Sequence, residues 1–210
     1  MGVCALAHRG YWLTPTERNT LAAFRRAFDH GFGAEIDVRD LDGELVVSHD
    51  PPRRGQLTLA EVVRVLQDSG TGGILAVNIK ADGLQEALAE ALADLDPARW
   101  FSFDMSVPDT LGYLRLGLPA FTRHSDVEPH PVLLDTADGV WLDDFSGHWL
   151  SETVIEDHLA EGRSVAVVSP ELHGRDHRAA WNDWRTWDVW TRPGVSLCTD
   201  HPLDAQEAFA

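Results

Sequence analysis

The chain has 210 residues, and 44% of them are hydrophobic, which is enough for a single domain over residues 1–210 with a filled core. The formal net charge of −17 disfavours nucleic acid and anionic membrane surfaces as partners, because both repel an acidic protein. No apolar run approaches the ~18 residues of a membrane-spanning helix, and the first residues read as a strand instead of a signal peptide. We therefore expect a cytoplasmic protein without membrane insertion, in which an anionic substrate would need a bound cation or a locally positive site.

Short apolar runs typical of buried parallel strands recur along the whole chain. They are Val3–Ala7, Gly33–Val38, Ile74–Ile79, Trp100–Phe103, Pro119–Thr122, Gly139–Leu142, Val165–Val168 and Val195–Thr199. Segments with helical spacing follow them: Thr20–His30, Leu57–Asp68, Gly83–Leu95, Val107–Leu116, Ser125–Ala137, Ser151–Gly162, Arg175–Trp187 and Leu203–Phe209. Thr58, with Glu61 three residues later, predicts a capping box, whereas Pro129 and Pro131 make the segment around them the weakest helix.

Strand–helix units that follow one another in this way favour a closed parallel barrel over an open doubly wound sheet. The predicted fold class is therefore α/β, a (β/α)8 TIM barrel. An extra hairpin interrupts the second unit, because Asp42-Gly43 is a tight-turn pair and Leu45–Val47 has the apolar character of a return strand. Reactive side chains of such a barrel lie at the carboxyl ends of its strands, so the residues there are the candidates for chemistry.

Glu35 and Asp37 are the most distinctive pair among these candidates. They alternate with apolar residues in one strand, and the two-residue period of a strand places both carboxylates on the same face. Two carboxylates inside a barrel repel each other and are costly to desolvate. A hard divalent cation, Mg²⁺ or Ca²⁺ with Mn²⁺ as a further candidate, would remove both costs. The alternative is that one carboxylate pairs with Arg9 or Lys80.

His8 and His49 are the candidates for proton transfer. Each ends an apolar run and is followed by a charged residue, Arg9 or Asp50. An unperturbed imidazole titrates near pH ~6.5, so it donates or accepts a proton readily at neutral pH. Lys80, the only lysine among 17 basic residues, ends another apolar strand, where its compact ammonium suits a phosphate oxygen.

The segment from His8 to Asp50 resembles the glycerophosphodiester phosphodiesterase family. The resemblance rests on ordered motifs at compatible spacing: His8-Arg9-Gly10, Arg18-Asn19-Thr20, Glu35-Ile36-Asp37, Asp42-Gly43 and His49-Asp50. Looser matches follow at Asn78-Ile79-Lys80, Ser102-Phe103 and Thr199-Asp200-His201-Pro202. The resemblance implies a TIM barrel with His8 and His49 as the acid/base pair and Glu35 and Asp37 as metal ligands.

The sequence departs from the family's pattern in three places. Asn78 stands where the family has a glutamate, so an amide oxygen would be the third metal ligand, and Asp104 or Glu171 would compensate for the lost charge. Arg18 stands where the family usually has a glutamate. The insertion that typically follows the His-Asp motif is absent, because the next helical pattern begins at Leu57. The part of the family that recognises glycerol is therefore missing or replaced.

Four residues on later strand ends are candidate substrate contacts: Asp104, Trp141, Glu171 and His173. Glu171 and His173 belong to the polar segment Ser169–His173, which would suit a substrate other than glycerophosphocholine. Trp141 ends a strand, where it would either stack on a sugar or choline group or pack in the core.

The predicted function is metal-dependent hydrolysis of a small phosphodiester, such as a glycerophosphodiester or a sugar or polyol phosphodiester. The metal, Arg9 and Lys80 would bind phosphate oxygens, while one histidine deprotonates the attacking hydroxyl and the other protonates the leaving alkoxide. One alternative is a lyase that stops at a cyclic phosphate. The other is a non-catalytic barrel that binds a phosphorylated ligand, which the missing carboxylate at Asn78 would favour.

Overall fold

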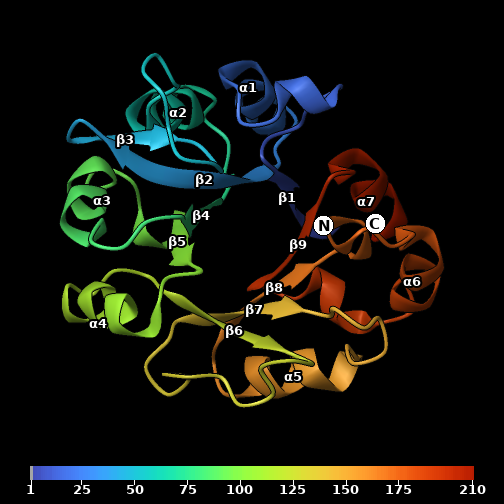
Figure 1. Cartoon of the computed structure of the whole chain (residues 1–210). Coiled ribbons are helices and arrows are strands. Elements are labelled where there is room, and N and C mark those ends of the chain that lie inside the picture. Colours follow the sequence, from blue (N-terminus) through green and yellow to red (C-terminus); the bar gives the residue numbers. More distant parts are fainter. Residues whose placement is uncertain (1) are drawn as a thin grey trace.

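The computed structural model describes residues 2–210, and its strands and helices form a parallel β/α barrel (Figure 1). The strands are β1 (Cys4–His8), β2 (Gly33–Leu41), β3 (Glu44–Val47), β4 (Leu75–Ile79), β5 (Trp100–Phe103), β6 (Phe121–Ser125), β7 (Gly139–Asp143), β8 (Ser164–Val168) and β9 (Val195–Thr199). The α-helices are α1 (Leu21–Asp29), α2 (Leu59–Asp68), α3 (Gln85–Ala91), α4 (Val107–Arg115), α5 (Glu152–Ala160), α6 (His177–Trp184) and α7 (Pro202–Ala208). The predicted fold class is confirmed.

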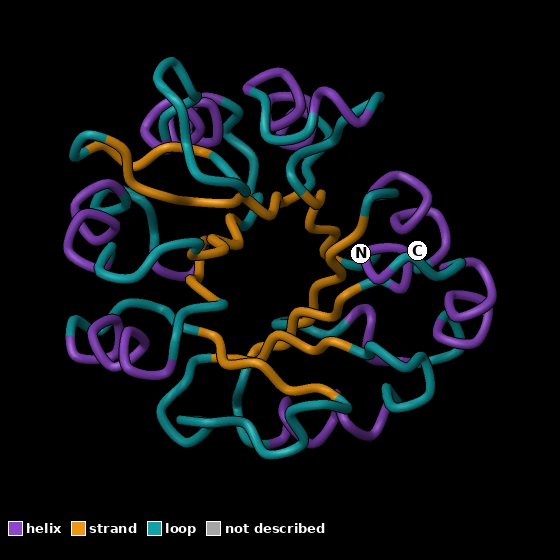
Figure 2. Tube along the Cα trace, viewed as in Figure 1, coloured by secondary structure: helices purple, strands orange, loops and turns teal. Residues whose placement is uncertain are grey.

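The strands follow the order β5-β4-β2-β1-β9-β8-β7-β6, and every neighbouring pair in this order is parallel. Figure 2 shows these strands as an inner ring with the helices outside it. β1 pairs with both β2 and β9, so the first and last strands close the ring. β5 and β6 are joined only by an isolated bridge between Ser102 and Ala120. We call this weakly paired contact the β5–β6 seam.

The predicted hairpin is also confirmed. β3 runs antiparallel to β2, with Leu41 paired to Glu44 across the Asp42-Gly43 turn. Both turn residues have positive φ, at 53° and 89°, which is the geometry that a two-residue hairpin loop requires. The hairpin extends β2 beyond its neighbours and carries the chain back to His49 at the carboxyl end of the barrel.

The barrel interior is a packed apolar core, and the end formed by the carboxyl ends of the strands is polar. Side chains of the strands form one apolar cluster: Leu6, Ala76, Phe101, Phe103, Phe121, Trp141, Ala166, Val168 and Cys198. Phe101 stacks on Phe121 with ring centroids 3.8 Å apart. The outward residues of the same strands pack against the helices, as Ala34, Ile36 and Val38 do from β2. This alternation leaves the last inward position of several strands for polar side chains.

One predicted helix is absent and the strand before it is shifted, while α3 and α6 are shorter than the predicted Gly83–Leu95 and Arg175–Trp187. No helix forms over Ser125–Ala137; the segment after β6 is a series of bends and turns, because Pro129 and Pro131 cannot donate the hydrogen bonds of a helix. The strand expected at Pro119–Thr122 instead spans Phe121–Ser125. The end of this strand is polar, so a search for apolar runs does not detect it. Arg123 lies there and points toward the polar end of the barrel, not into its apolar core.

The N-terminal cap positions of three helices agree with the sequence more closely. Thr58 caps α2 and forms the expected capping box with Glu61. Thr20 caps α1 by accepting a hydrogen bond from Ala23 N. Ser151 occupies the N-cap position of α5, but its side chain makes no capping hydrogen bond. Within residues 2–210, no helix has the length and apolar character that crossing a bilayer would require.

A partly buried histidine pair joins β6 to α5. His124 Nδ1 and His158 Nε2 are 2.8 Å apart, so one nitrogen donates a hydrogen bond and the other accepts it. Burial is the main reason that the pKa of His158 is lowered from 6.5 to about 4, and His124 and Arg163 lower it further. Burial also lowers the pKa of His124. The pair is therefore stable as neutral imidazoles.

We expect this pair to make the fold sensitive to acid. Because the folded pKa of His158 is below the unfolded value, its contribution is complete above pH 6.5 and is lost as the pH falls toward about 4. The loss should be on the order of 1–3 kcal/mol. Urea unfolding at about pH 7.5 and about pH 5 measures it. His158→Leu should flatten this dependence, whereas the exposed control His148→Gln should not. Equal losses in His158→Leu and the wild type would contradict this role.

Candidate active site

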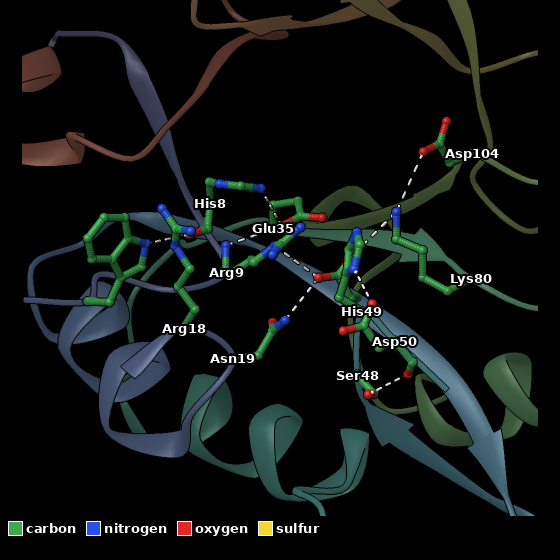
Figure 3. Close-up of polar contacts among 12 residues, drawn as sticks. His8, Arg9, Arg18, Asn19, Glu35, Ser48, His49, Asp50, Lys80 and Asp104 are labelled. Atoms are coloured by element: carbon green, nitrogen blue, oxygen red, sulfur yellow. Dashed lines mark hydrogen bonds and ion pairs between the residues drawn. The ribbon is translucent and has the colours of Figure 1, made fainter. Parts of the chain in front are cut away.

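Polar side chains from neighbouring strands converge at the carboxyl end of the barrel (Figure 3). They are His8 from β1, Glu35 and Asp37 from β2, Asn78 from β4, Arg123 from β6 and Asp143 from β7, with Asp104 and Asp200 directly after β5 and β9. The strand register explains their proximity. His8 pairs with Glu35, and Asp37 pairs with Asn78. The structure therefore brings together most of the residues that the sequence singled out.

His8 is held by a carboxylate from the last strand. Its Nδ1 lies 2.7 Å from Asp200 Oδ1, and Arg18 Nη2 lies 3.0 Å from the other oxygen of that carboxylate. Burial raises the pKa of Asp200, but the hydrogen bond from His8 and the charges of His8 and Arg18 outweigh it and lower the pKa below 3.8. An ionised carboxylate only accepts hydrogen bonds, so His8 Nδ1 carries a proton. Nε2 then faces Glu35 Oε2, 3.9 Å away.

Glu35 is a buried carboxyl group with few partners. Its side chain is 2% exposed, and Oε2 accepts a hydrogen bond of 3.1 Å from the backbone N–H of Arg9. Burial, followed by repulsion from Asp37, raises the pKa of Glu35 from 4.5 to about 7. The ionised form is therefore costly at neutral pH unless a cation is nearby.

Asp37 is surrounded by positive and donor groups. Arg9 Nε lies 3.1 Å from Oδ2, which also accepts a 2.9 Å hydrogen bond from Asn19 Nδ2. Lys80 Nζ lies 3.4 Å from Oδ1. The sequence left open whether one carboxylate pairs with Arg9 or Lys80, and Asp37 pairs with both. Arg9 and Lys80 thus lie on the same side of β2, next to the carboxylates.

The backbone of the His8-Arg9-Gly10 turn explains why these residues occur together. Arg9 and Gly10 both have positive φ, at 57° and 85°. A Cβ at Gly10 would lie 2.9 Å from Ala23 Cβ, so only glycine lets the turn pack against α1. Asn19 also has a positive φ of 57° and donates to Asp37. Non-glycine residues in this region are strained, and such strain concentrates at functional sites.

His49 lies at the same end of the barrel but is more open to solvent. Its side chain is 48% exposed, and Nδ1 is 3.1 Å from Asp50 Oδ1. It lines a cavity of about 370 Å³ together with Arg18 and Asn19. In Figure 3, Glu35 lies between His8 and His49. His8 and His49 thus lie at the same end of the barrel, and their assignment as an acid/base pair stays a prediction.

A network of alternating charges continues from Lys80 around the barrel mouth. Lys80 Nζ is 3.9 Å from Asp104 Oδ2, and Asp104 also forms an ion pair with Arg123. Arg123 Nη1 lies 3.0 Å from Asp143 Oδ2, and His173 Nε2 lies 3.0 Å from Asp143 Oδ1. Asp104 and His173, two of the candidate substrate contacts, therefore border the mouth on the side away from His8.

The other two candidate substrate contacts have structural partners. Glu171 accepts hydrogen bonds from Ser169 and Thr199 and, at 3.0 Å, from the backbone N–H of Asp200. It therefore holds the segment that carries Asp200. Trp141 is 6% exposed and stacks on Phe103 with ring centroids 3.9 Å apart, as a member of the barrel core. Its position favours packing, which the sequence analysis weighed against stacking on a ligand.

The upper end of the barrel has oxygen atoms that suit a hard cation. Asn78 Oδ1 is buried without a hydrogen-bond partner, beside Asp37 in the strand register. Glu35 is a buried carboxyl group that resists ionisation. A divalent cation would satisfy both, because Mg²⁺ and Ca²⁺ prefer oxygen ligands. Within residues 2–210, no group of three or more His, Cys, Asp or Glu side chains has a metal-binding arrangement. The Asn78 amide is the candidate for a third oxygen.

Sequence reasoning assigned no role to Asp200, Arg18, Asn19 or Arg123. The rule that strand ends carry the chemistry pointed to Asp200, but not to its hydrogen bond with His8. Arg18 was seen only as a departure from a motif. Arg123 was missed because the strand was expected to end at Thr122, one residue too early. A strand boundary drawn to Ser125 would have placed Arg123 at an inward position.

Together, the fold and the site define a (β/α)8 barrel with a His–carboxylate pair, buried acidic residues and cations at its carboxyl end. Similar solved structures include a glycerophosphodiester phosphodiesterase from Agrobacterium tumefaciens, with 18% identity, 98% of each chain covered and a TM-score of 0.73. An Oleispira antarctica phosphodiesterase in complex with the product sn-glycerol-3-phosphate has 18% identity, covers 99% of this chain and 96% of its own, and gives 0.67. A glycerophosphoryl diester phosphodiesterase from Parabacteroides distasonis has 16% identity, covers 99% and 86%, and gives 0.59.

No protein-family model matches the sequence, and no curated protein matches it. The likeness to solved structures extends over nearly the whole chain, but at these identities it shows the fold alone. The particular chemistry of this chain therefore has to be argued from its own residues.

Proposed function

We propose that this protein is a phosphoric diester hydrolase that cleaves a small, water-soluble phosphodiester with the help of a divalent cation. The observation that carries the proposal is the orientation of His8, with Nδ1 bound to Asp200 and Nε2 facing the Glu35 carboxyl. The Oleispira antarctica neighbour, solved with sn-glycerol-3-phosphate, supports a phosphate-containing ligand for this fold. We further propose the cytoplasm as its compartment.

The phosphate group would lie between the two histidines. Lys80 and Arg9 would bind non-bridging oxygens of the phosphate. Both cations lie at the proposed site, where each forms an ion pair with Asp37 next to Glu35. Glu35, Asp37 and Asn78 would hold Mg²⁺, Ca²⁺ or Mn²⁺. When bound, the cation would neutralise charge that develops on the phosphoryl oxygens. The excess of acidic residues near the mouth makes such a positive charge necessary for an anionic ester.

Proton transfer would be divided between the histidines. His8 Nε2 would accept the proton of the attacking hydroxyl, because its neighbour Nδ1 is already protonated toward Asp200. Asp200 would orient the imidazole and stabilise its charged form. His49, which is more exposed and lies beside Asp50, would donate a proton to the departing alkoxide. The attacking hydroxyl comes from water, or from the substrate itself if a cyclic phosphate forms first.

The experiment that tests this function is an assay of phosphodiesters with the purified protein. Glycerophosphocholine, glycerophosphoglycerol and methyl phosphodiesters of sugars would each be offered with Mg²⁺, Ca²⁺, Mn²⁺ or a chelator. We expect a phosphomonoester to form with at least one metal and turnover to stop in the chelator. Absence of turnover with every ester and metal would refute the hydrolase.

A substitution of Asp200 can distinguish a role in positioning His8 from a role in folding. Asp200→Asn should lower kcat/KM by about 100-fold or more, because the amide can donate to His8 Nδ1 and favour the wrong tautomer. The loss should appear in kcat with KM little changed, because Asp200 positions the imidazole and does not bind the substrate. The exposed neighbour variant Asp204→Asn should leave both unchanged. A fall in the amount of folded protein, measured by circular dichroism, that accounts for the whole loss of rate would indicate that Asp200 acts only in folding.

A further inference from the structure

The β5–β6 seam contains a second cavity at the carboxyl end of the barrel. Its volume is about 250 Å³, and its lining comes from residues 104–110 after β5, from 121–123 of β6 and from the turns at 128–133. Two features of the fold create it. β5 and β6 share only the bridge between Ser102 and Ala120, and no helix forms between β6 and β7 to cover the opening. We call it the seam cavity.

The seam cavity adjoins the proposed phosphate site through one ion pair. Asp104 lines the cavity, and its Oδ2 lies 3.9 Å from Lys80 Nζ. Lys80 in turn lies 3.4 Å from Asp37. Figure 3 shows Asp104 beyond the Lys80 amine, on the side away from His8. A group esterified to a phosphate at Lys80 would therefore reach the cavity directly.

The polar groups of the cavity are paired but reachable. Arg123 forms an ion pair with Asp104, and its Nε lies 3.4 Å from Glu128 Oε2. The side chains of Arg123, Asp104 and Glu128 are 27%, 25% and 53% exposed. A guanidinium supplies several fixed donors and a carboxylate supplies acceptors, so together they match the alternating donors and acceptors of neighbouring hydroxyl groups.

Most of the other residues that line the seam cavity are apolar, and this limits the ligand. They are Met105, Val107, Phe121, Val132 and Leu133, beside the hydroxyl side chains of Thr110 and Thr122. The lining carboxylates Asp104 and Glu128 outnumber the single guanidinium of Arg123, which disfavours a second anionic group. An alkyl chain would leave these charges desolvated without hydrogen bonds, which is costly. A neutral ring with hydroxyls on its edge and C–H groups on its face matches both the charged and the apolar residues that line the cavity.

We propose that the seam cavity binds the alcohol part of the substrate as a single hexose-sized, ring-shaped polyol, and that Arg123, Asp104 and Glu128 determine this specificity. This inference rests on the proposed hydrolase function and names its substrate class. It also supplies a recognition element in place of the insertion that the sequence lacks after His49-Asp50. The phosphate stays at Lys80, while the ring lies between β5 and β6.

The test compares methyl phosphodiesters whose second alcohol is glucose, inositol, glycerol, choline or hexanol. We expect kcat/KM for the glucose or inositol ester to exceed that for the hexyl ester by on the order of 10-fold or more. Arg123→Ala and Glu128→Gln should each reduce that ratio toward one. The ratio is measured within one protein preparation, so partial misfolding of a variant cancels. Arg115→Ala, at an exposed arginine of α4, is the matched control and should keep the wild-type ratio.

The outcomes separate this inference from the function on which it rests. Absence of turnover for every ester in the wild type would refute the proposed hydrolase function itself. Turnover without a preference for the ring polyols, or with the choline ester preferred, would overturn the seam cavity as a polyol site. A preference that survives Arg123→Ala and Glu128→Gln unchanged would overturn the role of these residues.

Discussion

Replacing His8 by glutamine should lower kcat/KM by on the order of 1000-fold, the largest single effect that we expect in this site. Glutamine keeps much of the size and polarity of the imidazole, but it cannot accept a proton at neutral pH. The fold should tolerate the change, because His8 is partly exposed at the strand end and its interactions are with Asp200 and Glu35. Steady-state kinetics on the best ester, together with circular dichroism to verify folding, measures this effect.

The same experiment can distinguish the base from the acid. An ester with a p-nitrophenyl leaving group needs little protonation as it departs, so it should largely restore the activity of His49→Gln. It should not restore His8→Gln, because the attacking hydroxyl still needs a base. His148→Gln, at an exposed histidine, is the matched control. Restoration of His8→Gln with His49→Gln still inactive would reverse the two roles, and full activity in either variant with ordinary esters would contradict the pair.

Replacing Glu35 by glutamine should abolish most of the metal-dependent rate, with a loss on the order of 100-fold or more. The change removes a charge from the cation site but keeps the shape of a side chain that is 2% exposed. Calorimetry should show correspondingly weaker binding of Mg²⁺, Ca²⁺ and Mn²⁺. Glu44→Gln, at an exposed glutamate of β3, is the matched control and should bind metal as the wild type does.

Asn78 allows the cation site to be tested in the opposite direction. Asn78→Asp would place a third carboxylate beside Asp37 and should tighten metal binding by about 10-fold, because ligand charge raises the affinity for a hard cation. Without metal, the same variant should be less stable than the wild type, since three buried carboxylates repel one another. If Asn78→Asp and Glu35→Gln both bound metal as the wild type does, these oxygens would not be the ligands.

Much of this architecture could be predicted because it follows from local patterns. The apolar strands, the Asp42-Gly43 hairpin and the Thr58 capping box depend on neighbouring residues, and the structure confirms them. The alternation of Glu35 and Asp37 likewise fixes a common face without knowledge of any contact. The helix predicted for the segment after β6 was wrong, because its two prolines oppose the helix that the repeating pattern indicates.

The parts of the site that escaped prediction depend on residues far apart in the chain. Asp200 meets His8 across 192 positions. The predicted closed barrel makes the first and last strands neighbours, but a sequence shows neither this side-chain contact nor the tautomer that follows. Arg123 lies at the polar end of a strand, and an apolar pattern does not detect a polar strand end. The pairing of Asp37 with both Arg9 and Lys80 also required side-chain geometry, since each cation alone would have been sufficient.

The most direct test of the central claim follows phosphorus NMR of one glycerophosphodiester incubated with metal-loaded wild-type protein and, in parallel, with His8→Gln. If His8 is the base of a metal-assisted hydrolase, the diester signal should convert to a monoester in the first sample and persist in the second. Equal conversion in both samples, or none in the wild type with Mg²⁺, Ca²⁺ or Mn²⁺, would contradict it.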